Sequence, residues 1–177
     1  MNRIFSITAL ALALIGAGVS TAAEAASRRA VHPNAEGGTT ASAVSAHTGA
    51  NGGAMVRGRG VKTDGQGTAA AVSGAALRGP NGATAARAGA TTRSADGSVQ
   101  HQSGMAAQGA KGSIDSSGSA SKGADGQVTQ NRTTTATSAA TGNRATSTSG
   151  YNSGTGRTRT TTCFDAAGAT IACPTRP

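Results

Sequence analysis

The sequence has very few of the residues that build a hydrophobic core. Its 177 residues include no Trp, one Tyr and two Phe, while 27 are Gly. Beyond residue 25, where we place the start of the mature chain, only eleven residues are Val, Ile, Leu or Phe. That fraction is far below the roughly 20% under which disorder is expected. We therefore predict a mostly disordered, low-complexity chain, in which any order is β structure: short hairpins or a thin β-solenoid.

The sequence also lacks the patterns that indicate catalysis or metal binding. Three histidines, His32, His47 and His101, stand apart from one another and from both cysteines, so none has metal-ligand spacing. At least three of the six acidic residues beyond residue 25 lie in expected turns, and no Gly-x-Ser-x-Gly motif lies between a strand and a helix. We therefore expect a non-enzyme with no catalytic, metal-binding or cofactor-binding residues, no cofactor and no specific small-molecule ligand.

Residues 1–25 are typical of a secretory signal peptide. A basic start that includes Arg3 precedes the uncharged, apolar residues 4–19. Ala23 and Ala25 supply the small residues that signal peptidase requires, so we predict cleavage after Ala25. The alternative is an uncleaved membrane anchor, but the apolar run is shorter than the roughly 20 residues needed to span a bilayer. We expect a secreted or periplasmic protein without a transmembrane anchor in its mature chain.

The composition divides the rest of the chain into four segments. Residues 26–60 are expected to be a flexible, basic, Gly-rich leader without a long strand. Its Arg57-Gly58-Arg59-Gly60 run suggests RNA binding, but no aromatic residue lies nearby for base stacking. Residues 61–131 hold repeated Asp-Gly turn signals, residues 132–159 are rich in Thr and Ser, and residues 160–177 form a C-terminal hairpin and tail.

A duplicated pattern lies within residues 92–131. Residues 92–102 and 121–131 each place Ala-Asp-Gly between a basic residue and Val, so that Asp96 and Asp125 are equivalent. Four dipeptides in the wider region favour turns because Gly, Asn and Asp tolerate the backbone angles of tight turns. They are Asp64-Gly65, Asn81-Gly82, Asp96-Gly97 and Asp125-Gly126. We expect two-residue type I′ turns at the last two dipeptides, with Arg93 opposite Gln100 and Lys122 opposite Thr129.

Alternating threonines form two short runs near the C-terminus. Thr133, Thr135 and Thr137 make up one run, and Thr158, Thr160 and Thr162 make up the other. In a strand, each run would project its hydroxyls from one face. Such a ladder resembles the ice-binding face of β-solenoid antifreeze proteins, which implies an ice-binding function. The alternatives are a polar β-edge and a disordered Ser/Thr-rich tract.

The two cysteines, Cys163 and Cys173, are expected to close a C-terminal hairpin. With Ala167-Gly168-Ala169 as the loop, Cys163 lies opposite Cys173 across the hairpin. An exported chain with two cysteines in such a register favours an intramolecular disulfide. A redox or metal-binding role, or an intermolecular bridge, is the alternative.

Charge gives the remaining indication of function. The chain has 16 Lys and Arg against 7 Asp and Glu, a net charge of +9. The bases are scattered along the sequence, which favours weak, salt-sensitive binding to polyanions over a specific site. Our first hypothesis is an exported structural or matrix-associated protein that acts through an extended surface and can self-associate. The alternatives are a secreted module that binds nucleic acid, acidic polysaccharide or an envelope polymer, and an ice-binding protein.

Overall fold

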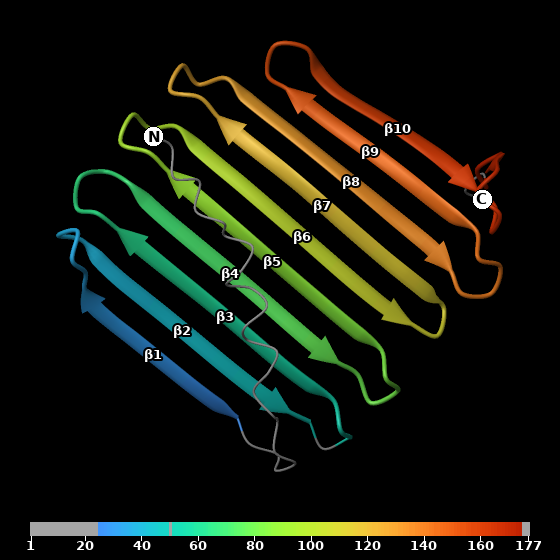
Figure 1. Cartoon of the computed structure of the whole chain (residues 1–177), viewed down its shortest axis with the longest axis horizontal. Coiled ribbons are helices and arrows are strands. Elements are labelled where there is room, and N and C mark those ends of the chain that lie inside the picture. Colours follow the sequence, from blue (N-terminus) through green and yellow to red (C-terminus); the bar gives the residue numbers. More distant parts are fainter. Residues whose placement is uncertain (1–24, 50, 175–177) are drawn as a thin grey trace.

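The structure is a single open antiparallel β-sheet (Figure 1). It is a computed structural model that describes residues 25–49 and 51–174. Eleven strands lie side by side in the order in which they follow one another in the chain. Their bounds are β1 Ala26–Pro33, β2 Thr39–Thr48, β3 Ala54–Thr63, β4 Ala69–Arg78, β5 Thr84–Arg93, β6 Val99–Gly109, β7 Gly112–Lys122, β8 Val128–Ser138, β9 Arg144–Asn152, β10 Gly156–Phe164 and β11 Thr170–Ile171. The expected class of any order, β hairpins, is confirmed, and the hairpins join into one open meander instead of a solenoid.

This sheet is one layer thick and has no hydrophobic core. Among the described residues only Cys163 and Ser116 are buried, and Leu77 is 47% exposed. Every strand from β2 to β9 is paired along most of its length with a neighbour on each side, so the backbone hydrogen bonds that a disordered chain gives to water are made within the sheet. The prediction of a mostly disordered chain is wrong because it tied order to buried side-chain area. In this sheet, order comes from backbone hydrogen bonds between neighbouring strands and from the turns that join them.

The predicted flexible leader is part of the sheet. Residues 26–60 contain β1, β2 and most of β3. The Arg57-Gly58-Arg59-Gly60 run lies inside β3, where Gly58 pairs with Val44 on one side and Gly74 on the other. Glycine weakens a strand, but pairing on both sides keeps this one extended. The expectation of a leader without a long strand is therefore wrong.

Several of the tight turns are three-residue loops that end in a left-handed glycine. Between β5 and β6, the N–H of Ser94 donates to the carbonyl of Ser98, and the N–H of Gly97 donates to the carbonyl of Ser94. Gly97 has φ of 85°, whereas no non-Gly residue of the described chain has positive φ. A type I turn followed by a left-handed residue fits this pattern.

The predicted two-residue type I′ turns are therefore wrong, and so is their register. Arg93 lies opposite Val99, one position from the expected Gln100. Lys122 likewise lies opposite Val128 in place of Thr129. Only the glycine of each dipeptide takes the left-handed conformation, so each loop gains one residue. Glycines with positive φ recur at equal spacing along the chain, at Gly37, Gly52, Gly67, Gly82, Gly97 and Gly112.

The C-terminal hairpin is closed by the predicted disulfide. The Sγ atoms of Cys163 and Cys173 are bonded, with their Cα atoms 5.2 Å apart. The register differs from the expected one, since Cys163 lies opposite Ile171. The loop is Ala166-Ala167-Gly168, again with a left-handed glycine at its end (φ 87°). Cys173 thus reaches Cys163 from two residues beyond the paired position.

The predicted signal peptide lies almost wholly outside the described residues. Of the cleavage-site residues, Ala23 is outside them and Ala25 directly precedes β1. Cleavage and export therefore stay predictions, with which the disulfide is consistent. In the described part of the chain, no helix has the length and apolar character needed to cross a membrane.

Candidate functional site

The two faces of the sheet carry different side chains. Successive residues of a strand point to opposite faces, and residues paired across strands point to the same face. The ladders run without interruption from β1 to β10, so each side chain can be assigned to a face. We call the face of Arg57 and Arg59 the arginine face, and the face of Gly58 and Gly60 the small-residue face.

Most of the basic side chains lie on the arginine face. Nine basic residues of the described strands point to it: Arg29, Arg57, Arg59, Arg87, Arg93, Lys122, Arg132, Arg157 and Arg159. Four point to the other face: Arg28, Lys62, Arg78 and Arg144. The only acidic residue of the described strands, Asp115, also points to the small-residue face. The sequence interpretation that the bases are scattered missed this segregation.

Six of these arginines form a band across the middle of the sheet, which we call the arginine track. They are Arg29, Arg57, Arg59, Arg87, Arg132 and Arg159, and they occupy two adjacent rows of paired residues. The track runs from β1 to β10, over nine interstrand spacings of about 4.8 Å, or roughly 43 Å in all. It crosses the strands at right angles to their direction.

Serine hydroxyls hold several guanidinium groups against the sheet. The Nε of Arg57 donates to the Ser45 hydroxyl at 2.9 Å, and the Nε of Arg159 donates to the Ser147 hydroxyl at 3.1 Å. In both cases the terminal nitrogens stay available to a ligand on the outside. These bonds reduce the freedom of the side chains before any partner binds.

Arg132 lies flat across a neighbouring strand. Its Nη1 donates to Ser116 of β7 and its Nη2 donates to Ser103 of β6, both at 2.9 Å. Gly118 occupies the position between Arg132 and Ser103 in the same row. A Cβ at Gly118 would lie 2.7 Å from the carbonyl oxygen of Asn131 and 3.3 Å from the Cβ of Arg132. Because Gly118 has no side chain, the Arg132 side chain has room to cross β7 and reach Ser103.

The small-residue face carries a compact threonine array. Thr133, Thr148 and Thr160 form one row over β8, β9 and β10, and Thr135, Thr146 and Thr162 form the next row. The two alternating runs found in the sequence therefore lie on one face, with β9 between them. Hydroxyls of Thr135 and Thr146 are hydrogen-bonded at 3.2 Å.

The predicted turn residues lie at both ends of the sheet. Asp64-Gly65, Asp96-Gly97 and Asp125-Gly126 are in turns at one end, and Asn81-Gly82 is at the other. The Oδ1 atoms of Asp96 and Asp125 accept the N–H two residues further on, from Ser98 and Gln127. The structure brings none of these residues together with another into a binding site.

Hydrogen bonds at two turns lower the pKa of their carboxyl groups. For Asp64, the main cause of the lowered pKa is the backbone N–H of Gln66, followed by Thr68. For Asp96, the hydroxyl of Ser98 lowers the pKa first and its backbone N–H adds to the effect. Asp96 is exposed and Asp64 is partly exposed, and the bonds of both carboxyl groups stabilise their local turns.

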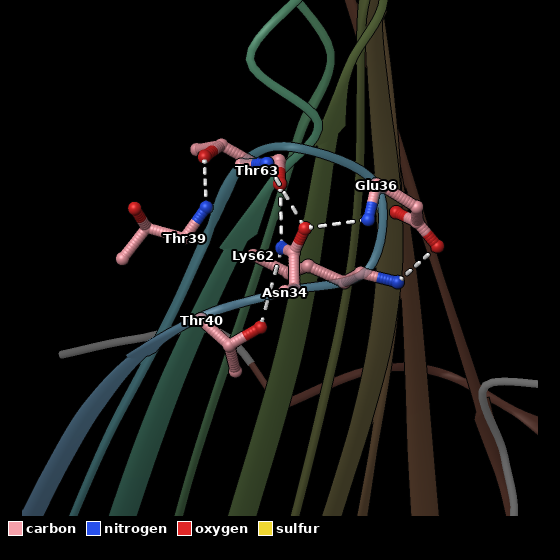
Figure 2. Close-up of polar contacts among 7 residues, drawn as sticks. Asn34, Glu36, Thr39, Thr40, Lys62 and Thr63 are labelled. Atoms are coloured by element: carbon pink, nitrogen blue, oxygen red, sulfur yellow. Dashed lines mark hydrogen bonds and ion pairs between the residues drawn. The ribbon is translucent and has the colours of Figure 1, made fainter.

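The turn between β1 and β2 contacts β3 through a polar cluster (Figure 2). Asn34 Nδ2 donates to the carbonyl of Thr63 at 2.8 Å, while its Oδ1 accepts the N–H groups of Glu36 and Gly38. Lys62 and Glu36 form an ion pair at 2.6 Å, the only one in the described residues. Half-exposed pairs of this kind stabilise little, so the cluster acts as a local fastening of the first hairpin.

Two open hollows mark the surface. One, of about 490 Å³, is lined mainly by amides and hydroxyls of the small-residue face such as Gln102, Asn131 and Thr158. The other, of about 860 Å³, lies at one end of the strands and is mainly apolar, with Leu77 and Ile114 in its lining.

The histidines are dispersed over the sheet. His32, His47 and His101 lie on β1, β2 and β6, and the described residues contain no group of three His, Cys, Asp or Glu placed to hold a metal ion. His101 Nδ1 is 2.8 Å from Thr91 Oγ1. This histidine points to the arginine face, where no acidic residue of the described strands lies to complete a catalytic triad.

No protein-family model, curated protein or solved structure matches the chain. Evidence about the function of this chain therefore comes from the geometry of its two faces.

Proposed function

We propose that this chain is an exported, non-enzymatic structural protein that is associated with an extracellular matrix or envelope and acts through the broad faces of its sheet. The observation that carries this proposal is the single layer with both faces open to solvent, since only Cys163 and Ser116 are buried among the described residues. Enzymes bind substrates in concave sites that exclude water and shift pKa values. This sheet instead offers extended surfaces.

Charges at both edges of the sheet oppose growth by strand addition. β1 carries Arg28 and Arg29 and ends at Pro33, and β10, which pairs with β11 only at Cys163 and Phe164, carries Arg157 and Arg159. Basic residues and proline are common protections of edge strands. Self-association is therefore expected to occur face to face and to increase as salt screens the arginines.

Fractionation of the source cells tests the structural proposal. The full-length protein, tagged at its C-terminus, is expected in the envelope or extracellular fraction, with Ala26 as its first residue by mass spectrometry. High salt is expected to release it from that fraction. A cytosolic protein with an intact N-terminus would overturn the proposal.

A second candidate function is polyanion binding. Its support is the concentration of nine basic residues on one face of the described strands, without an acidic residue among them. Retention on a heparin or DNA column is expected to fall steeply as salt rises. Retention that is equal at low and high salt would exclude this function.

Ice binding is a third candidate, supported by the two rows of three threonines on the small-residue face. The measurement is thermal hysteresis of the soluble protein. Thr135→Val would keep the shape of its side chain and remove the hydroxyl, whereas Thr146→Ser would keep the hydroxyl and remove the methyl group. Absence of hysteresis in the unchanged protein would exclude the candidate.

A further inference from the structure

We infer that the arginine track binds a linear acidic polysaccharide whose chain lies across the strands. This inference rests on the polyanion-binding function proposed above and adds the partner class and the path of the polymer. Three features of the track support it: the small side chains that lie between its arginines, the spacing of its charges, and the serine hydrogen bonds that hold some of its guanidinium groups.

The two rows that carry the track form a shallow, small-residue floor. The fourteen other residues in these two rows are Ser, Ala, Thr or Gly, with Met105 as the one exception. The next row on each side carries larger side chains on some strands, such as Leu77 and Ile114 on one side and Val61 and Tyr151 on the other, and alanine on several others. A linear polymer can therefore lie along the floor while arginines and serine hydroxyls contact it.

Charge spacing favours a polymer of low charge density. Successive arginine-bearing strands of the track are two or three strands apart, which is about 10 to 14 Å. Duplex DNA carries one charge per about 1.7 Å of its axis, far more than the track can match. An acidic polysaccharide in which a charged sugar alternates with a neutral one spreads its carboxylates much more widely.

The composition of the track points away from single-stranded nucleic acid. Proteins that bind single strands stack the bases on aromatic side chains. The two rows of the track contain none, and Tyr151 lies one row away. Hydroxyls are abundant instead, and they can donate to and accept from the hydroxyls of a sugar chain.

Two guanidinium groups of the track, those of Arg57 and Arg159, are positioned for carboxylates before binding. Arg57 and Arg159 use Nε for their serine bonds, so both terminal nitrogens of each can form a paired contact with a carboxylate. Lysine could not form this two-pronged contact, and the two rows of the track contain arginines but no lysine.

A titration of the full chain with fluorescein-labelled hyaluronan fragments at low salt tests the inference by fluorescence anisotropy. The track variant is R29S/R59S/R87S. Its matched control is R28S/K62S/R78S, which removes the same charge from the small-residue face. We expect about tenfold weaker binding for the track variant, since each exposed charge pair contributes roughly two- to threefold in affinity, and less than about twofold for the control.

Two further measurements separate the possible failures. R57K, which keeps the charge and loses the two-pronged guanidinium contact, is expected to weaken binding, whereas simple charge attraction would leave binding unchanged. Far-ultraviolet circular dichroism checks that each variant keeps the sheet, and R59S alone replaces the triple variant if that one unfolds. Equal losses in track and control variants would overturn the track while leaving polyanion binding intact. Tighter binding of a duplex DNA probe than of hyaluronan would assign the face to nucleic acid, and no binding of either probe would overturn both the inference and the polyanion function.

Discussion

Gly118→Ala is expected to destabilise the sheet although alanine is the better residue for a strand. The added Cβ would lie 2.7 Å from the carbonyl oxygen of Asn131 and 3.3 Å from the Cβ of Arg132. Neither the backbone oxygen nor the start of the arginine side chain can move without shifting β8. Overpacking of this kind costs about 1 to 3 kcal/mol, and the gain from replacing a strand glycine offsets roughly 0.5 to 1 kcal/mol of it. The net expected loss is about 0 to 2.5 kcal/mol, centred on about 1 kcal/mol.

Gly89→Ala is the matched control because Gly89 lies in the same row and on the same face. Its Cβ would meet the carbonyl oxygen of Gln102 and the ring of His101 at 3.5 Å, which is ordinary contact. This variant is expected to gain about 0.5 kcal/mol. Urea unfolding of both variants, followed by circular dichroism, measures the difference through the midpoint at constant slope. A Gly118→Ala protein as stable as Gly89→Ala would refute the close approach of β7 and β8 and the path given to Arg132.

Three other predictions concern the turns and the disulfide. Reduction of Cys163–Cys173, separated by 10 residues, is expected to cost about 2 to 3 kcal/mol in the chain-entropy model; urea midpoints with and without reductant measure it, and the variant C163S/C173S should be insensitive to reductant. Gly97→Ala, at φ of 85°, is expected to cost about 1 to 2 kcal/mol, whereas an unchanged melting temperature would contradict the left-handed turn. Asp64 and Asp96 have lowered pKa values in the folded protein, so their contribution is complete above about pH 4 and is lost as pH falls through the lowered values. D64N/D96N keeps the Oδ1 acceptors, and its unfolding midpoint should depend less on pH between about 2 and 4 than that of the unchanged protein; equal pH dependence would contradict this assignment.

Local signals in the sequence predicted the turns and the disulfide better than they predicted order. A glycine after Asp or Asn marks a turn because only glycine takes positive φ without strain. The disulfide could be predicted from the expected export of the chain and the short separation of its two cysteines. Registers were wrong by one position at Gly97 and by two at Cys163 because the choice between loops of different length depends on the whole hairpin. The disorder prediction failed because apolar content measures buried area, and this sheet buries almost none.

The functions proposed for the two faces could not be predicted from the sequence, because they depend on residues that lie far apart in the chain. Arg29 and Arg59 share a row although they lie far apart in the chain, and so do Arg57 and Arg87. One whole strand and two turns separate the strands of each pair, and this step returns the chain to the same face and the same row. Along the sequence these arginines look isolated.

Turn length therefore controls the arginine track as much as the arginines do. Side chains alternate between faces with a period of two residues, so one residue added within a strand would move every later side chain of that strand to the other face. An insertion before Arg132 in β8 would send it from Ser103 and Ser116 to the small-residue face. The left-handed glycines, such as Gly97 and Gly126, hold their loops at three residues and so keep neighbouring strands in register. Turn glycines that lie far from the track therefore help to determine which side chains lie on the arginine face.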